Sequence, residues 1–445
     1  MEPNIVLGVN IAGISINIFG VILALALSIF LIIKKLNPVL SMFLGVFVGA
    51  LVGQASLPEM LNIVILGSRQ VVGINIRIIA GGVLAGALIE TGAAESIARG
   101  IVKGLGEKRA LLAITLSSMI VVGVGVFIPV ALLVVSPIAL SVAYKANISK
   151  FTAILAISGG GKAGNMISPN PNALAAAESF DMSLSSVMLN GFLPALAALA
   201  ATMVICNLLK QKHFKVADSD ISDSDGNSAD LPPFKRAIVA PALSVGLLML
   251  NPIGDILGIA FIDSQSLPMD PFYVLPIGAV VGIFAMGKGK QATDIATKGV
   301  LRMAPVVLML FGAGAIGGLI TTSVFPAMIS DVLSAIGLEY AFLAPISSTI
   351  FSSVTGSNAA GVIIGGESFA GDILQAGVPA IAGAVMLHAG GGFIDVMPHG
   401  NIFLATQQSM NCSMAERLKV VPYEALVGGI MTATAVLMYV IGFWS

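Results

Sequence analysis

Charged residues are scarce in this sequence. Of its 445 residues, only 10% are Asp, Glu, Lys or Arg, whereas a soluble domain carries about 25%. The hydrophobic fraction is 57%, so a water-soluble fold is excluded and a lipid bilayer is the expected surrounding. The net charge of −1 gives no reason to expect nucleic acid as a partner.

Cysteine and enzyme motifs are scarce as well. Cys206 and Cys412 are the two cysteines, and they form neither a metal-ligand spacing nor a disulfide framework. The sequence contains no Walker loop, no GxSxG and no HExxH motif. We therefore expect no enzymatic activity, no metal site and no cofactor.

Long apolar segments are abundant, and spans of about 17–25 residues are long enough to cross a bilayer. The predicted elements of the first half are spans at 16–33, 38–54, 77–98 and 187–209, a re-entrant hairpin at 110–122 and 129–144, and a broken span at 151–180. Those of the second half are spans at 237–260, 272–286, 303–325 and 422–442, a hairpin at 341–366, and a broken span at 378–409. The expected divisions are residues 1–209, a hydrophilic cytoplasmic linker at 210–236, and residues 237–445.

Two glycine-rich stretches occupy the predicted broken spans. They are SGGGKAGNMISPNPN at 158–172 and HAGGGFIDVMPHGN at 388–401. Glycine and proline are expected to stop the flanking helices. At membrane depth such breaks are tolerated only where the freed backbone is buried in protein or lines a wet cavity, so both stretches predict a binding site.

The two halves match at a nearly fixed offset of about 230–233 residues, which predicts an internal repeat. The matched landmarks are Pro38 with Pro271, Gly45 with Gly278, Ser117 and Ser118 with Ser347 and Ser348, and Gly159–Gly161 with Gly390–Gly392. Chance matching of abundant glycines is the alternative.

Lysine and arginine predict the orientation of the halves, because basic loops favour the cytoplasm. The basic loops of the first half have acidic or uncharged counterparts in the second half. The expected map places 19 of the 22 basic residues inside, Arg417 among them, with Arg69 and Arg77 outside and Lys162 in a break. The sequence therefore predicts two inverted-topology repeats with both chain ends outside, an architecture of secondary transporters.

Two charges of opposite sign fall within the predicted breaks. An intramembrane charge is costly and by default marks a path for an ion or a substrate. We expect Lys162 to contact the substrate and Asp395 to take up the coupling ion. A purely structural pair, or a Lys162 that extends to the membrane interface, is the alternative.

Neutral polar side chains accompany these charges. Helix N-termini present unpaired N–H groups that suit an anion, although Asn and Ser beside glycine can also be simple caps and turns. The residues expected to bind the substrate, with Lys162, are Asn165, Ser168, Asn170, Asn172, Ser357, Asn358, His399 and Asn401. His388 is a second candidate for the coupling ion because histidine changes charge near neutral pH; a hydrogen-bonded packing residue is the alternative.

The two broken spans and the helices that follow them resemble the gluconate permease (GntP) family, within the ion transporter superfamily of organic-anion carriers. The resemblance implies that Pro169–Asn172 and the hairpin tip at Ser357 and Asn358 hold a carboxylate substrate. It also implies a homodimer in the bacterial inner membrane, in which hairpins and broken helices move against a scaffold. The sequence differs from the family's gluconate carriers at Asn170 and Asn172, where those carriers tend to have histidine and glycine.

The expected function is a symporter for a small organic anion, such as a hydroxy or sugar acid, coupled to H⁺ or Na⁺. A Na⁺/H⁺ antiporter is one alternative, and a short-chain or dicarboxylate carrier of the same superfamily is another. An antiporter would more naturally place several acidic residues in the breaks, and only Asp395 lies there.

Overall fold

The computed structural model describes residues 5–6, 9–10, 14–34, 36–220, 231–259, 261–263, 266–336 and 339–444. Helices dominate these ranges, and their only strands are β1 (Ile5–Val6) and β2 (Val9–Asn10), which pair antiparallel. The helices of the first half are α1 (Ile18–Ile33), α2 (Pro38–Val52), α3 (Leu57–Gln70), α4 (Val72–Glu90), α5 (Ala93–Leu105), α6 (Ala110–Gly123), α7 (Ile128–Lys145), α8 (Lys150–Met166), α9 (Pro171–Ser179), α10 (Leu184–Asn190) and α11 (Phe192–Leu208). Those of the second half are α12 (Phe234–Ala237), α13 (Val239–Leu257), α14 (Pro271–Ala285), α15 (Ala292–Thr321), α16 (Phe325–Ile336), α17 (Leu343–Thr355), α18 (Asn358–Gln375), α19 (Ala380–Gly391), α20 (Asn401–Ser409) and α21 (Met414–Val440).

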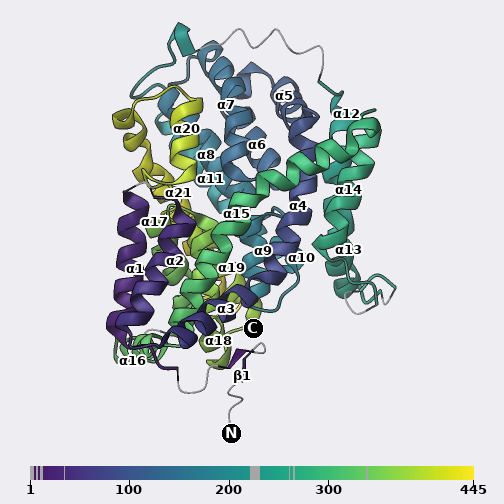
Figure 1. Ribbon diagram of the computed structural model, residues 1–445. Helices are drawn as coiled ribbons and strands as arrows, with labels where there is room; N and C mark the ends of the chain where they lie inside the picture. The colour runs from purple at the N-terminus through teal and green to yellow at the C-terminus, as the bar shows by residue number, and fades with distance from the viewer. Residues whose placement is uncertain are drawn as a thin grey trace.

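Several of these helices are suited to a membrane. Five segments are long and apolar enough to cross a bilayer: α4, α7, α12 with α13, Gly289–Thr321, and α21. α10 and α11 form a further candidate span with a bend of 44°. The chain is therefore an all-α polytopic membrane protein. In Figure 1, α1 and α2 lie at one side, α13 and α14 at the other, and the long α15 runs diagonally between them.

Most predicted spans match helices, and four differ. The span expected at 422–442 begins already at Met414, as α21, and the span expected at 187–209 is divided between α10 and α11. The span expected at 77–98 begins five residues earlier as α4 and ends at a turn where Gly92 has a φ of +78°. The span expected at 303–325 begins eleven residues earlier, because α15 is a single helix of 30 residues. The sequence did not predict α3 and α16, and parts of α5 and α10 were assigned to the spans expected at 77–98 and 187–209. These four helices are short or amphipathic and so lack the long apolar run on which the span predictions depend.

The glycine triplets do not interrupt their helices where we expected. α8 continues through Gly159–Gly161 to Met166, and α19 ends only after the second glycine of its triplet. The reason is close packing: a Cβ added to Gly160 would overlap the backbone oxygen of Thr115 on α6. In the second half, a Cβ on Gly390 would overlap the backbone oxygen of Pro345 on α17.

A second packing contact also occurs in both halves. A Cβ on Gly45 of α2 would overlap the Ser28 hydroxyl of α1, and a Cβ on Gly278 of α14 would overlap the Ser244 hydroxyl of α13. The sequence produces these helices in the same way, because α2 and α14 each start with proline after an Asn or Asp cap, the favoured position for proline.

The predicted cytoplasmic linker is only partly solvated. Its residues 221–230 lie outside the described part of the chain. Asp220 is buried and forms an ion pair with Lys150 at 2.6 Å, and Tyr144 donates a hydrogen bond to Asp218 at 2.8 Å. The first part of the linker is therefore fastened to the ends of α7 and α8.

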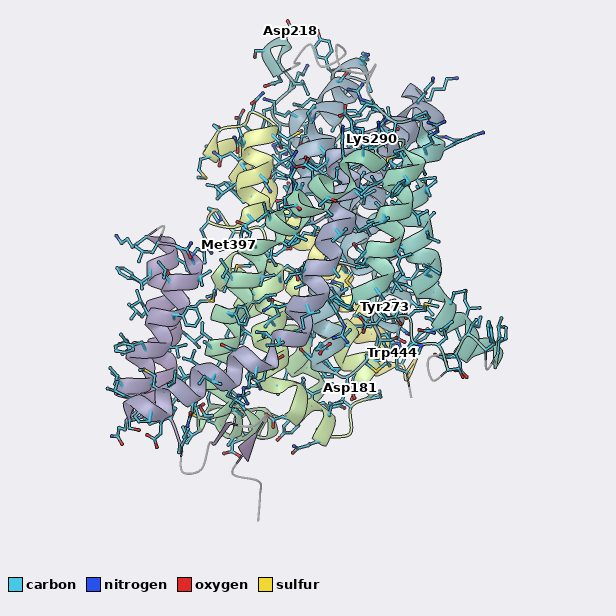
Figure 2. The ribbon with its side chains drawn as sticks, turned by 45° about the vertical axis from the view of Figure 1, so that its right-hand side comes forward. Asp181, Asp218, Tyr273, Lys290, Met397 and Trp444 are labelled. Carbon is cyan, nitrogen blue, oxygen red and sulfur yellow. The ribbon has the colours of Figure 1, made fainter. Side chains whose placement is uncertain are left out.

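The two ends of the molecule carry different landmarks. Figure 2 shows Asp218 and Lys290 towards one end, and Asp181 and Trp444 towards the other. Met397, between α19 and α20, lies at an intermediate height in the same view. The second helix break is therefore far from both ends.

Candidate functional site

The first helix break separates α8 from α9 at residues 167–170. Pro171 is the first residue of α9 and cannot donate a backbone hydrogen bond to continue α8. The Asn170 side chain caps α9 by accepting hydrogen bonds from the backbone N–H groups of Asn172 and Ala173, at 2.8 and 3.1 Å. Asn170 is therefore a helix cap as well as a predicted substrate residue.

The second break, at residues 392–400, separates α19 from α20. No side chain caps the N-terminus of α20, which leaves its first backbone N–H groups without an internal partner. His399 Nε2 lies 3.0 Å from the backbone oxygen of Val354 near the tip of the α17–α18 hairpin. This contact holds the second break against the hairpin.

The hairpin tip and the second break meet at two glycines. Gly356 has a φ of +64°, and a Cβ there would come within 2.7 Å of the Gly400 Cα. Only glycine fits this position, because it tolerates both the left-handed backbone and the close approach.

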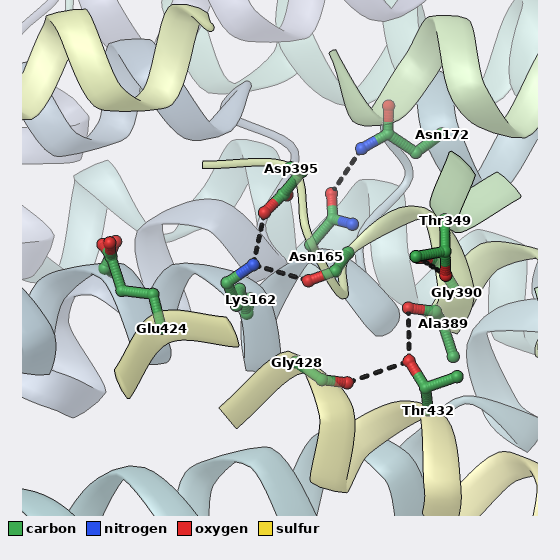
Figure 3. A network of polar contacts seen from close by, with 12 residues as sticks. Lys162, Asn165, Asn172, Thr349, Ala389, Gly390, Asp395, Glu424, Gly428 and Thr432 are labelled. Atoms are coloured by element: carbon green, nitrogen blue, oxygen red, sulfur yellow. Dashed lines mark hydrogen bonds and ion pairs between the residues drawn. The ribbon is translucent and has the colours of Figure 1, made fainter. Parts of the chain in front are cut away.

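Lys162 and Asp395 meet, as their opposite charges suggested, although Lys162 lies within α8, four residues before its end, and not in the break where we expected it. The Lys162 ammonium donates hydrogen bonds to the Asp395 carboxylate and to the backbone oxygen of Gly392 (Figure 3). Both side chains are almost fully buried, at 2% and 0% exposure. Removing one partner would leave an uncompensated charge, which is strongly destabilising. Asp395 Oδ2 is buried and has no hydrogen-bond partner in the described chain, so it is available to a further ligand.

An amide cluster links α8, α9 and α19. Asn165 Oδ1 accepts hydrogen bonds from the side-chain amides of Asn170 and Asn172, both at 2.9 Å. Asn165 Nδ2 lies 3.1 Å from His388 Nε2. Since Asn165 Oδ1 is an acceptor, its Nδ2 is the donor and His388 Nε2 accepts, which assigns the imidazole proton to Nδ1.

Ser168 has a structural role. Its hydroxyl is fully buried and donates a hydrogen bond to the backbone oxygen of Val122 at 2.6 Å. This bond ties the first break to the C-terminal end of α6.

A small cavity lies between the tips of the two hairpins. Its lining residues are Phe127, Ile128, Pro129, Asn172, Gly356, Ser357, Asn358, Ala359, Asn401 and Ile402. Of the predicted substrate residues, Asn172, Ser357, Asn358 and Asn401 line this cavity. The other predicted substrate residues do not line it: Lys162, Asn165, Ser168, Asn170 and His399. The cavity volume is about 10 Å³, room for about one water molecule, so the hairpin tips must separate before an organic anion can enter.

Two of the residues that line this cavity carry unpaired amide groups. Both polar side-chain atoms of Asn358 are buried without a hydrogen-bond partner in the described residues, and so is Asn172 Oδ1. Buried polar groups are almost always paired in folded proteins, and exceptions require an explanation. A polar ligand between the hairpin tips would satisfy these atoms.

Four helices begin at this cavity. Its lining includes the cap or first residues of α7, α9, α18 and α20. Helix N-termini carry partial positive charge, which favours a bound carboxylate. Asn170 and Ser357 cap α9 and α18, whereas α7 and α20 have no side-chain cap and keep free N–H groups. The lining contains no charged side chain. The four dipoles are therefore the main electrostatic feature of the cavity.

A second buried ion pair was not predicted from the sequence. Arg417 and Glu424 on α21 are fully buried and form two hydrogen bonds, of 2.7 and 2.9 Å. The Arg417 Nε also donates to Thr406 Oγ1 on α20 at 2.7 Å. Our expectation that Arg417 belongs to a cytoplasmic loop is wrong, because α21 begins three residues before it. The seven-residue spacing of opposite charges, which places them two turns apart on one helix face, was the signal available.

Arg77 connects three elements at the edge of α4. It forms ion pairs with Asp270, the N-cap of α14, at 2.8 Å and with Glu178 near the end of α9. All three side chains are about one-third exposed. Elsewhere in the described chain, no group of three or more His, Cys, Asp or Glu side chains is placed to hold a metal ion.

Comparison with known proteins identifies the same class of molecule across nearly the whole chain. Residues 16–442 match the family described as GntP family permease. An uncharacterized transporter of Haemophilus influenzae is 42% identical over 425 residues, covering 96% of this chain and 98% of that protein. The gluconate permease of Bacillus subtilis is 24% identical over 359 residues, covering 75% and 79%.

More distant proteins are similar in sequence or in fold. A high-affinity gluconate transporter of Escherichia coli is 22% identical over 332 residues, covering 72% of this chain and 73% of that protein. Among solved structures, the YdaH transporter of Alcanivorax borkumensis superposes with a TM-score of 0.55 at 17% identity, covering 84% of this chain and 86% of that chain.

Proposed function

Because this chain belongs to the GntP permease family, we propose that it is a secondary active symporter of a small organic anion. It is a permease and not an enzyme. The proposed substrate is a hydroxy or sugar acid such as gluconate, and the proposed coupling cation is H⁺ or Na⁺. The gluconate transporters among its relatives, at 22–24% identity, support a gluconate-like acid.

The cavity between the hairpin tips is the observation that carries this proposal. Four helix N-termini favour a carboxylate there, and the buried amides of Asn172 and Asn358 have unused hydrogen-bonding capacity. These amides suit the hydroxyl groups of a hydroxy acid, because an amide can both donate and accept. Lys162 on α8 and Asp395 in the second break do not line this cavity. They are the proposed site of coupling to the cation.

Two inverted-topology repeats, each with a re-entrant hairpin and a broken helix, are the proposed architecture. Both halves have the same order of hairpin, broken helix and final long helix. The close contact of Gly45 with Ser28 in the first half also has an equivalent in the second half, between Gly278 and Ser244. α2 ends next to α3 at one end of the molecule, whereas α14 ends towards Lys290 at the other (Figures 1 and 2). Opposite directions of equivalent helices are what inversion requires.

Transport is proposed to occur by movement of the hairpins and broken helices, α6–α9 and α17–α20, against a scaffold of the remaining spans. The protein is proposed to act as a homodimer in the bacterial inner membrane, with both chain ends outside. Lys290 and Asp218 lie towards the same end of the molecule (Figure 2). Lys290 and the linker that contains Asp218 are both in basic segments of the sequence, and basic loops favour the cytoplasm, which supports this orientation.

Two alternatives remain distinct from this proposal. A Na⁺/H⁺ antiporter would carry ions with no organic anion present. A carrier of short-chain or dicarboxylic acids would use the same cavity with a different preference. Phe127, Ile128 and Ile402 form apolar walls of this cavity. Uptake measurements with different carboxylates distinguish the two substrate classes.

Uptake by purified protein in liposomes tests the proposal. Radiolabelled gluconate, lactate, butyrate and succinate are compared with and without imposed pH and sodium gradients. A binding screen accompanies uptake, because a ligand at 100 times its Kd stabilises the folded state by about 2.7 kcal/mol. Accumulation of one carboxylate, lost in Asn358→Ala, is the expected result. Ion flux without any organic anion would support the antiporter instead.

A further inference from the structure

Four buried charges lie side by side in the core of this protein. Lys162 on α8 pairs with Asp395, and Arg417 pairs with Glu424 on α21. Three of the four side chains have 0% exposure and Lys162 has 2%. Their charges sum to zero, so neutralising any one of them leaves a net charge in a region with little water to screen it.

The two pairs share one face of α8. Ser158 donates a hydrogen bond to Glu424, and Ser158 and Lys162 are four residues apart on the same helix, so they point in the same direction. Figure 3 shows Lys162 between Asp395 on one side and Glu424 on the other. The second pair is thus next to the first and is fixed to the same helix.

The two carboxylates differ in how firmly they are held. Glu424 accepts two hydrogen bonds from Arg417 and one from Ser158, and charge-assisted bidentate contacts of this kind favour the ionised form. Asp395 receives Lys162 through Oδ1 and keeps Oδ2 unpaired. Asp395 is therefore the carboxylate that can change its charge, while Glu424 keeps its own.

We propose that Arg417 and Glu424 are a fixed pair of positioning residues that sets how readily Asp395 takes up and releases a proton as the coupling cation. The inference rests on the proposed function, since it assigns a role within the same transport cycle. Glu424 favours cation uptake at Asp395 and compensates the Lys162 ammonium while Asp395 is neutral. Arg417 opposes uptake and so limits the effect of Glu424.

Few other charged groups lie near enough to Asp395 to influence its uptake of a cation. In the described chain, the titratable or charged side chains around the Asp395 loop are Lys162 on α8, His388 on α19, and the Arg417–Glu424 pair. His399, in the loop itself, contacts Val354 instead. His388 accepts from Asn165, which keeps it in a neutral hydrogen-bonded form.

The test is the pH dependence of uptake into liposomes by Glu424→Gln and Arg417→Gln. Removing the Glu424 carboxylate should shift the pH of half-maximal uptake downwards, and removing the Arg417 guanidinium should shift it upwards. Each shift should be about one pH unit, as expected for a nearby charge in a protein interior. The double variant should return close to the wild-type midpoint. Opposite shifts are the signature of charge, because a merely structural loss would affect both single variants in the same direction.

Controls separate charge from folding. Ser158→Ala removes a hydrogen bond to Glu424 but no charge, so its midpoint should not move. Glu416→Gln removes a carboxylate that is exposed and caps the start of α21, and its midpoint should also stay. Should the single variants fail to fold, Arg417→Lys and Glu424→Asp, which keep both charges, should retain the wild-type midpoint.

Three outcomes would overturn the inference: shifts in the same direction, no shift in either folded variant, or uptake by the wild type that depends on sodium and not on pH. In each case the wild type still transports a carboxylate, so the proposed function stands. If the wild type transports no carboxylate at all, the proposed function itself fails.

Discussion

Asn165 and His388 join α8 and α19, the helices that precede the two breaks, through a hydrogen bond of 3.1 Å between residues 223 apart in the sequence. His388 is fully buried, and its Nδ1 has no partner among the described residues. The geometry makes His388 an acceptor for Asn165 in a neutral tautomer. This arrangement suits a packing residue better than a carrier of the coupling proton.

His388→Gln should therefore keep the pH profile of uptake. Glutamine can place an acceptor near the position of Nε2, whereas His388→Leu leaves the buried amide of Asn165 unpaired and should lower the free energy of unfolding by about 1–3 kcal/mol. Uptake across pH and thermal unfolding of both variants check this. A changed pH profile in a well-folded His388→Gln protein would instead make His388 a coupling residue.

Lys162→Ala should abolish uptake and also lower stability, because it leaves Asp395 as a buried, unpaired charge. Breaking such a pair costs about 3–5 kcal/mol, whereas replacing both partners with apolar groups of similar size is often neutral. We therefore expect Lys162→Met with Asp395→Leu to recover the thermal midpoint but not uptake. Recovery of uptake in the double variant would show that the pair is only structural.

The sequence predicted the location of the breaks better than their cause. Proline and asparagine at 169–172 end one helix and cap the next, as local preferences require. The glycines were assigned to the breaks because sequence alone does not show that Gly160 faces the backbone of Thr115. That contact is between helices, and a single glycine in a helix lowers its stability without ending it.

The site was only partly predictable for a similar reason. Polar residues inside apolar spans, such as Lys162 and Asp395, stand out in a sequence because burying them is costly. Arg417 did not stand out in the sequence, because it lies near the start of a helix, where basic residues normally belong to the cytoplasmic side. Its burial follows from the packing of α20 and α8 around it, which no local pattern encodes.

Asn358→Ala should lower substrate affinity, whereas Ser168→Ala should lower stability. Asn358 lines the cavity and makes no side-chain hydrogen bond in the described chain, so its loss should weaken substrate binding about tenfold or more, with little change in stability. Ser168 bonds Val122 outside the cavity, so its loss should lower stability by about 1 kcal/mol and leave affinity unchanged. Binding titration and thermal unfolding of both variants provide the comparison. Equal affinity in Asn358→Ala and wild type would remove Asn358 from the site.

Asp220→Asn should destabilise the protein from outside the transport site. Lys150 and Asp220 are both buried, at 7% and 6% side-chain exposure, and the Lys150 ammonium also donates to the backbone oxygen of Asn411. Neutralising Asp220 leaves a buried ammonium, at a cost of several kcal/mol. Asp218→Asn, which affects an exposed contact with Tyr144, is the matched control. Equal thermal midpoints for the two variants would contradict the burial argument.

The Arg77–Glu178 ion pair should bias the conformational equilibrium of transport. It joins α4, in the proposed scaffold, to the end of α9, in the proposed moving unit, and Arg77 keeps a second partner in Asp270. Partly exposed pairs contribute about 0.2–1 kcal/mol, so Glu178→Gln should change the ratio of the two states by up to about fivefold. Glu95→Gln, which removes an ion pair within α5 alone, should have no effect on this ratio.

A disulfide reporter can measure this shift. A Cβ on Gly317 of α15 would lie 3.1 Å from the Glu367 Cβ of α18, so Gly317→Cys with Glu367→Cys should cross-link in the state described here, with Cys206 and Cys412 replaced by serine. Glu178→Gln should lower the rate of cross-linking, because it removes a contact that holds the two units together. An unchanged rate, with Glu95→Gln as reference, would mean that the contact does not restrain the movement.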